Sequence, residues 1–353
     1  MRRRQFAALG LAALLAFSLA GCGGKKADEG RTSGLYYEAA GISPDAVLLT
    51  VDGREVPAWR YLYWLTWGCD QLKAAYDAAG LTLDWSETLE GTDLADYVRQ
   101  QALDNTVLYA TVENWAEQYQ VEITDADQPQ MDSLWAKQAE EAGGEEEYLA
   151  QMADRGLERS EAEALCEDAL LYRKLSQLSA ESGSALAPAE GAVEAFAGER
   201  GYLTLEWLVV PVTDEADRES CREQAASLFS QINASADPPA AFAALEETYG
   251  TGDSARTFLP GAGVLPEAVE EASKTLEEGQ WSGILEADDG FYLLLRRPLD
   301  TAAVAADYFD SRLQQAAREA EVTTTSAFDT LEVPTFYERL TAARDGARDD
   351  AGT

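Results

Sequence analysis

The sequence predicts an α+β protein in which a helical domain, built from N- and C-terminal segments, carries an inserted α/β domain. Two apolar strand patterns, at residues 203–211 and 291–295, bracket a central stretch with helical segments between them. Outside this stretch, apolar residues recur with helical spacing. The apolar segment at residues 331–340 needs a partner surface, and the helices before residue 180 are the obvious one, which predicts one discontinuous helical domain.

The expected domain boundaries follow from these patterns. We expect a signal peptide at 1–21, a flexible tether at 22–43, an N-terminal helical domain at 44–199, the inserted domain at 200–299, a C-terminal helical segment at 300–345 packed on the N-terminal domain, and a frayed tail at 346–353.

The composition excludes several classes of function. The 353 residues carry a net charge of −37, which disfavours binding to nucleic acids and to anionic lipid surfaces. An alternative is that this charge serves solubility alone. The chain contains no histidine, so it lacks the usual neutral-pH general base and the commonest metal ligand. The carboxylates form no calcium-loop or paired-acid motif, so we expect no metal and no cofactor.

The first residues have the pattern of an export signal. A basic start, Arg2 to Arg4, precedes an apolar run at residues 6–19, which is too short for a comfortable membrane span. The exit, Leu-Ala-Gly-Cys22, resembles the bacterial lipobox. The resemblance implies cleavage before Cys22, a lipid on its thiol, and a location at the extracytoplasmic face of a cell membrane. The alternative is an ordinary signal peptide with an incidental cysteine.

The remaining cysteines show no metal or redox spacing. Cys69, Cys166 and Cys221 lie far apart, without a C-x-x-C pair. Buried free thiols are the default interpretation, and one disulfide with one free thiol is the alternative.

Aromatic residues are concentrated in the first long helical pattern after residue 57. The candidates for contact with a peptide are Trp59, Tyr63, Trp64 and Trp67. Most aromatic residues with helical spacing belong to a core, but some of these could line a groove for apolar peptides.

The central stretch resembles the parvulin-type peptidyl-prolyl isomerase domain over about a hundred residues. After the first strand, the residues that carry the resemblance are Phe242-Ala-Ala-Leu245, Leu276, Gly279, Trp281 and Ser282, and Gly290-Phe-Tyr-Leu-Leu294. The flanking segments are similar to those of extracytoplasmic foldases of the PrsA and SurA type, in which such a domain accompanies a helical chaperone domain. The resemblance implies a foldase for unfolded or extended exported polypeptides, X-Pro segments included.

The family's catalytic pattern is altered in this chain. The two histidine positions of the family correspond to Trp207 and Tyr292, and the loop cysteine or aspartate position corresponds to Gly252, with Asp253 adjacent. Only the apolar shelf, at Leu265 and Val269, keeps its character. Prolyl isomerisation requires no covalent step, so activity does not depend strictly on histidine, but a bulky tryptophan would fill the pocket.

Two functions from different classes follow from this pattern. The first is a tethered chaperone or foldase whose isomerase domain is degenerate. The second is a non-catalytic adaptor or structural lipoprotein that binds one specific partner.

Overall fold

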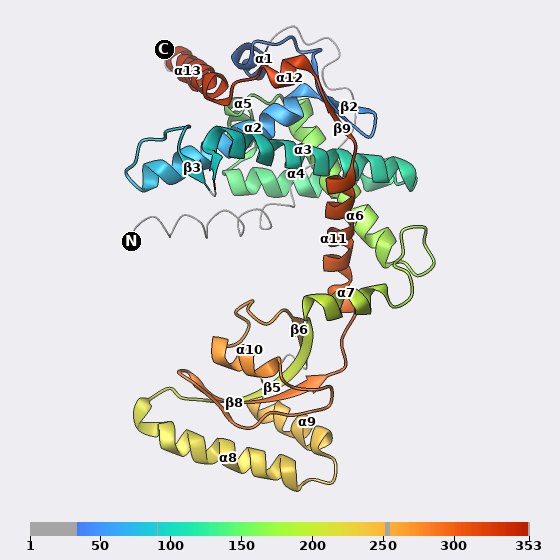
Figure 1. The fold of residues 1–353 in the computed structure, drawn as a ribbon, viewed down its shortest axis with the longest axis vertical. Coiled ribbons are helices and arrows are strands. Elements are labelled where there is room, and N and C mark those ends of the chain that lie inside the picture. Colours follow the sequence, from blue (N-terminus) through green and yellow to red (C-terminus); the bar gives the residue numbers. More distant parts are fainter. Residues whose placement is uncertain (1–33, 90, 251–254, 352–353) are drawn as a thin grey trace. The chain divides into compact units, whose positions relative to one another are not determined.

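The computed structural model describes residues 34–89, 91–250 and 255–351. Its helices and sheets place the chain in the α+β class, which confirms the predicted class. The chain divides into two compact units (Figure 1). The described residues up to Ala187 and from Ser311 form one unit, here called the helical unit, and Pro188–Asp310 form the other, the insert unit.

The helical unit is built mainly from long helices of both chain ends. Its elements in chain order are α1 Leu35–Ala40, β1 Val47–Val51, β2 Arg54–Pro57, α2 Ala58–Ala78, β3 Thr88–Leu89, β4 Thr92–Asp93, α3 Leu94–Gln118, η2 Asp125–Asp127, α4 Gln128–Ala142, α5 Glu145–Asp154, α6 Arg159–Ala180, β9 Val322–Thr324, α12 Ser326–Asp329 and α13 Val333–Ala351. Helix α11, Ala305–Glu319, begins in the insert unit and ends in this one.

A three-stranded antiparallel sheet joins the two chain ends. Its strand order is β2-β1-β9, with Thr50 opposite Thr323. The β1–β2 hairpin turns through Asp52 and Gly53, both of which have positive φ, at 50° and 81°. An Asp-Gly pair suits this turn because glycine adopts positive φ without a steric cost and aspartate tolerates it. Strand β9 comes from the C-terminal segment, so this part of the helical unit is complete only when both chain ends are present.

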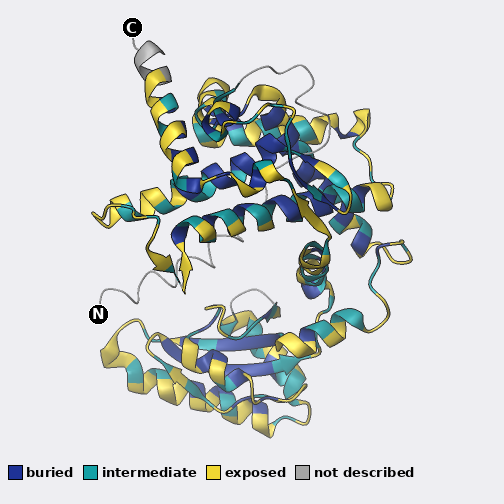
Figure 2. Cartoon of the chain, turned by 45° about the horizontal axis from the view of Figure 1, so that its top comes forward, coloured by how far each residue is buried: buried dark blue, intermediate teal, exposed yellow. Residues whose placement is uncertain are grey.

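One apolar core fills the helical unit. Tyr36, Leu62 and Phe336 are 0%, 0% and 1% exposed and belong to the same cluster, although they come from α1, α2 and α13. In Figure 2 the buried residues gather in the interior of each unit. Burial of so many large side chains supplies the main favourable free energy of folding.

The insert unit is a four-stranded antiparallel sheet with helices on both faces. Its strand order is β6-β5-β8-β7. Its elements are α7 Ala192–Arg200, β5 Leu203–Pro211, η3 Glu215–Asp217, α8 Arg218–Ala234, α9 Pro238–Tyr249, β6 Arg256–Phe258, α10 Glu267–Ser273, β7 Leu285–Ala287, β8 Gly290–Arg297 and η4 Ala302–Val304.

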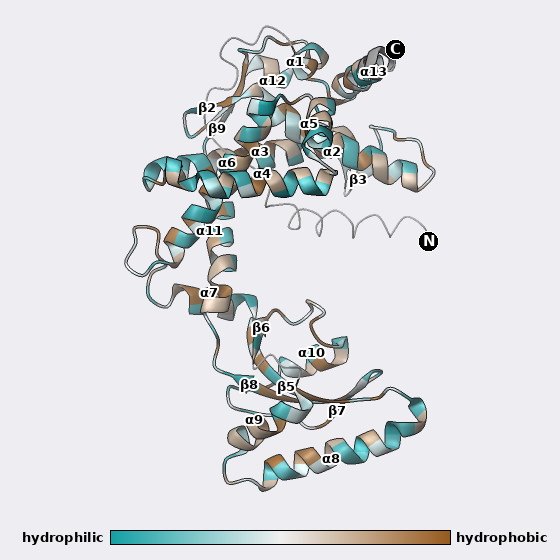
Figure 3. Ribbon diagram, turned by 180° about the vertical axis from the view of Figure 1, so that it is seen from behind, coloured by the Kyte–Doolittle hydropathy of each residue, from teal (hydrophilic) through white to brown (hydrophobic). Residues whose placement is uncertain are grey.

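Alternation along β5 divides the insert core into two layers. Leu205 and Trp207 pack with residues of α10, whereas Leu208 and Val210 pack with residues of α8 and α9. Successive side chains of a strand point to opposite faces, so both faces of a doubly covered sheet are apolar. Figure 3 shows this hydrophobic character along β5 and β8. The near-continuous apolar run in the sequence therefore reflects burial on both faces.

The C-terminal region differs from the sequence-based expectation. The helix expected at 302–320 is present as η4 and α11. Beyond it, the sequence predicted a short extended piece with one helical turn at 331–340, whereas the structure has β9, α12 and a long α13 that continues past residue 345 to Ala351. Strand β9 escapes detection because its three residues are all exposed and show no alternation. None of the described helices is long and apolar enough to cross a membrane.

Candidate functional site

The predicted proline pocket corresponds to one face of the insert sheet, beneath α10. Trp207 of β5 lies opposite Leu294 of β8, and Tyr292 of β8 lies opposite Val209 of β5. Trp207 and Tyr292 therefore lie on adjacent strands, and both belong to the core cluster on the α10 side. Leu265 and Val269 belong to the same cluster. The sheet thus brings together four of the six residues that the sequence singled out.

Side chains fill this region. Trp207 and Tyr292 are each 6% exposed, Leu265 is 7% exposed and Val269 is fully buried. The Trp207 indole also packs edge-on against Phe258, with 6.5 Å between the ring centroids. The other two predicted pocket residues, Gly252 and Asp253, lie outside the described residues.

Tyr292 uses its hydroxyl to hold the neighbouring turn. The phenolic Oη donates a hydrogen bond to Asp289 at 2.7 Å. Burial, this hydrogen bond and the nearby Asp289 charge raise the pKa of Tyr292 far above its ordinary value. Tyr292 therefore stays protonated at neutral pH and cannot act there as a general base.

Glu270 of α10 shapes the loop that carries Leu265. Its carboxylate is only 2% exposed and accepts hydrogen bonds from the backbone N–H groups of Gly261, Gly263 and Leu265. Burial by itself would raise the pKa of Glu270, but these donors lower it. Sequence reasoning missed this residue, because a glutamate in an acidic helix looks like one more solvated side chain.

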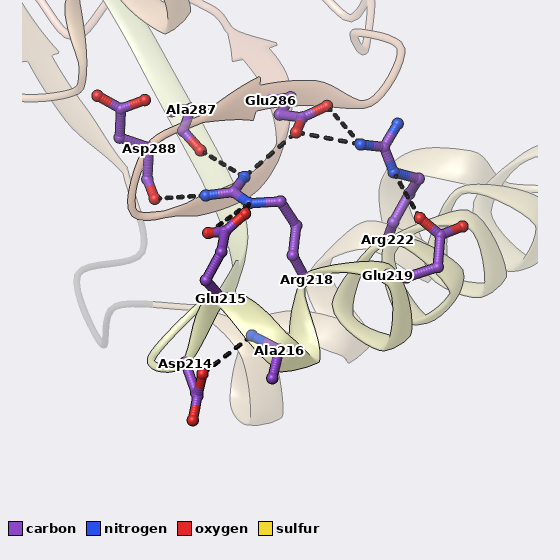
Figure 4. A network of polar contacts seen from close by, with 9 residues as sticks. All are labelled: Asp214, Glu215, Ala216, Arg218, Glu219, Arg222, Glu286, Ala287 and Asp288. Atoms are coloured by element: carbon purple, nitrogen blue, oxygen red, sulfur yellow. Dashed lines mark hydrogen bonds and ion pairs between the residues drawn. The ribbon is translucent and has the colours of Figure 1, made fainter.

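Two arginines of α8, which covers the other face of the sheet, hold the β7–β8 turn (Figure 4). Arg218 contacts Glu215 and Glu286 and donates to the carbonyl of Asp288 at 2.8 Å. Arg222 reaches the same Glu286 carboxylate at 3.0 Å. Both guanidinium groups also lie over the ring of Phe291, at 5.9 and 5.4 Å. Their charges are thus compensated within the protein, and this cluster stabilises the β7–β8 turn against α8.

The predicted peptide contacts of α2 divide into two pairs. Trp59 and Tyr63 are 1% and 9% exposed and belong to the core of the helical unit. Trp64 and Trp67 are partly exposed, and Trp64 stacks on Tyr109 of α3 at 5.2 Å. Trp64 and Trp67 are therefore the only members of the predicted set that retain surface, and both are already in contact with another aromatic ring.

A buried ion cluster lies beside these aromatic residues. The Arg60 guanidinium contacts Asp168 of α6 and donates to Glu113 of α3 at 3.0 Å, while Asp168 is fully buried. Burial raises the pKa of Asp168 to about 7, although the Arg60 charge opposes this rise. We read the cluster as structural, because it ties three helices together around one guanidinium.

The described cysteines are free thiols, so the alternative of one disulfide does not hold for them. Cys69 and Cys166 are buried, and burial raises the pKa of Cys166 to about 11. A thiol in this state is a poor nucleophile. Cys22, the predicted lipid attachment residue, lies outside the described residues. Among the residues that the structure describes, no group of three or more Cys, Asp or Glu is placed to hold a metal ion.

Comparison with known proteins gives similarity at the level of distant structure. No protein-family model matches the chain, and no curated protein matches it. The foldase PrsA of Streptococcus pneumoniae is similar at 16% identity, over 73% of this chain and 92% of that one, with a TM-score of 0.26. PrsA of Bacillus subtilis is similar at 12% identity, over 73% and 93%, with a TM-score of 0.23.

A SurA-like chaperone of Campylobacter jejuni is also similar, at 13% identity over 67% of this chain and 93% of that one, with a TM-score of 0.22. TM-scores this low do not establish a shared arrangement of the whole chain. No residue role is therefore transferred from these proteins.

Proposed function

We propose that this protein is a membrane-anchored extracytoplasmic foldase or chaperone for exported polypeptides, with a parvulin-like domain that has lost its isomerase pocket. The observation that carries the proposal is the filled face of the insert sheet. Trp207 and Tyr292 occupy the positions where an isomerase would keep polar side chains beside an open proline site, and both are 6% exposed.

The chemistry explains why a closed cleft matters more than a missing histidine. Rotation about the X-Pro bond crosses a barrier of about 18–20 kcal/mol, set by amide resonance. A pocket lowers this barrier by holding the twisted amide away from water, without breaking a bond. A proline ring must enter for this to happen, and the low exposure of Trp207, Leu265 and Val269, all packed in one cluster, argues against an open site for it. We therefore expect binding without catalysis.

A protease-coupled assay on proline peptides tests the catalytic part. The wild-type chain is expected to show no rate above the uncatalysed background. A clear isomerisation rate in the wild-type chain that disappears in Val269→Trp, which places a larger side chain among the pocket residues, would contradict the proposal that isomerase activity is lost. Circular dichroism of Val269→Trp must first show the wild-type fold.

Suppression of aggregation of a denatured reporter tests the chaperone part. The full chain is expected to keep the reporter in solution. If it has no effect on two unrelated reporters, the chaperone proposal is wrong.

The anchor proposal rests on Cys22 and has its own test. Wild type expressed in a bacterium is expected to partition into detergent and to carry a diacylglycerol on this residue. Cys22→Ser should release the protein from the membrane fraction, and an unchanged membrane association would contradict the lipid anchor.

One observation favours the adaptor alternative. Among the described residues, only Leu81 and Val322 are large hydrophobic side chains classed as exposed. A promiscuous chaperone usually displays more apolar surface than this. A single stable partner recovered after cross-linking, together with no effect on unrelated reporters, would support the adaptor over the chaperone.

A further inference from the structure

A surface hollow of about 500 Å³ lies in the helical unit, away from every site predicted from the sequence. It lies between the C-terminal half of α2, the loop at residues 79–87 and the first turns of α13. Its apolar lining is Leu81, Leu83, Trp85, Pro334 and Tyr337. Leu81 is 49% exposed, the most of any large hydrophobic residue described.

The loop that forms one wall is held in place by its own hydrogen bonds. Gly80 has a φ of +67°, which ends α2 and lets the Leu81 N–H donate to the Tyr76 carbonyl at 2.9 Å. Further along, Asp84 accepts the N–H of Ser86 at 3.0 Å, and Tyr76 Oη donates to Glu87 at 2.7 Å. The exposed Leu81 is therefore presented by a fixed loop, and binding there would cost little additional ordering.

Helix α13 forms the other wall with one face. Pro334, Tyr337, Glu338 and Thr341 follow the spacing that places residues on one side of a helix. The Tyr337 ring is anchored, since its Oη donates to Asp70 at 2.9 Å and Trp85 packs edge-on against it at 5.8 Å. Both walls are thus preformed in the free protein.

The charges around the hollow favour a cationic ligand. Its one lining cation, Lys73, is paired with Asp77 at 2.5 Å. Glu338 is exposed, and within the part of the chain that the structure describes no cation pairs with its carboxylate. The chain as a whole carries a charge of −37. A basic residue would be attracted to this rim, whereas an anionic lipid surface would be repelled.

We propose that this hollow binds extended polypeptide segments in which an apolar or aromatic side chain lies next to a basic residue. The apolar side chain packs against Leu81 and Trp85, and the basic residue pairs with Glu338. The nature of the polypeptide, an exported chain, rests on the proposed function, but the site itself does not.

Fluorescence anisotropy with three labelled peptides tests the proposal on the full chain. The first peptide is a short extended segment with a central phenylalanine flanked by arginine. The second replaces arginine by glutamate, and the third replaces phenylalanine by serine. The first is expected to bind at least about fivefold more tightly than either of the others. Its affinity should fall as salt is added, because the ion pair at the rim is exposed.

Variants of the protein locate the site. Leu81→Ser should lower the affinity for the first peptide by about tenfold, since it removes an apolar contact without disturbing the core. Glu338→Lys should lower the affinity for the first peptide by about fivefold and should raise the affinity for the glutamate peptide. The matched controls are Val322→Ser, at the other exposed large hydrophobic residue, and Glu140→Lys, an equal charge change on α4. Both controls should bind like wild type.

Three results would overturn the proposal. The first is equal affinity for the arginine and glutamate peptides. The second is unchanged binding in both Leu81→Ser and Glu338→Lys. The third is binding of the hollow to phosphatidylglycerol vesicles in place of peptide, detected as sedimentation that Leu81→Ser abolishes. Aggregation assays separate this proposal from the proposed function. Suppression that survives in both variants contradicts the site alone, whereas peptide binding without suppression contradicts the chaperone function alone.

Discussion

Two buried carboxylates, one in each unit, are compensated in different ways. In the insert unit, the buried Glu270 carboxylate is satisfied by backbone N–H groups of the loop at residues 261–265. In the helical unit, the buried Asp168 carboxylate is held by a side chain, Arg60. The reason lies in the backbone. N–H groups in the interior of a helix pair with the carbonyls of the same helix, so Asp168, in the middle of α6, depends on a cationic side chain. The loop at residues 261–265 has N–H groups that no helix uses, and these donate to Glu270.

Replacing Trp207 by alanine should produce the largest loss of folding stability, and this loss should be limited to the insert unit. Trp207→Ala removes a buried indole from between β5, Phe258 and α10, and should cost about 3–5 kcal/mol. Hydrogen exchange of the full chain should show faster exchange in residues 188–310 only. Val209→Ala, at a half-buried position on the same strand, is the control and should cost much less. Equal losses would mean that Trp207 is not a core residue.

Replacing Arg60 should affect the helical unit instead. Arg60→Met leaves the buried Asp168 without its cation and should cost about 3 kcal/mol, measured by urea unfolding. The double variant Arg60→Met with Asp168→Leu should recover most of the loss, because an apolar pair needs no charge compensation. If the double variant is less stable than the single one, the cluster contributes more than charge pairing.

Removing the Glu270 carboxylate tests its role as the acceptor for the backbone N–H groups of the loop at residues 261–265. Glu270→Ala leaves the N–H groups of Gly261 and Leu265 without an acceptor and should cost about 1–3 kcal/mol. The loop at 261–265 should then exchange its amide protons faster, while the sheet stays protected. Glu271→Ala, the exposed neighbour on α10, is the control and should be nearly neutral.

The smallest expected effect is a pH dependence from the buried Asp168 carboxylate of the helical unit. Burial, opposed by Arg60, raises the pKa of Asp168 to about 7, so the folded chain holds a proton there that the unfolded chain has lost. This group therefore stabilises the fold more at about pH 5 than at about pH 8, with the contribution lost as pH rises towards 7. Asp168→Asn should flatten the difference in unfolding free energy between these two pH values. An unchanged difference would show that other groups cause it.

The strands and the insertion were predictable because their signals are local. The residues at 203–211 predicted β5, and the apolar run at 291–295 lies inside β8, Gly290–Arg297. An apolar run of strand length with glycine and aspartate at its ends needs no tertiary information. The Asp52-Gly53 turn was equally local. Strand β9 was not, because its pairing with β1 joins residues about 270 positions apart.

The candidate sites show the same division. The alignment of motifs identified Trp207, Tyr292, Leu265 and Val269, and the sheet brings these four together. Their state, filled instead of open, depends also on Phe258, which no motif contains. The hollow beside Leu81 was missed entirely, because its two walls come from residues 73–85 and 334–341, and no spacing rule connects them.

The sequence alone therefore determined the α+β class, the strand segments of the insert and the absence of histidine, since each depends on residue type and short-range periodicity. Only the tertiary structure decided that β9 pairs with β1, that Glu270 binds a loop, and that Leu81 faces α13. These features depend on which distant surfaces meet, and that is set by packing of the whole unit, which local patterns do not encode.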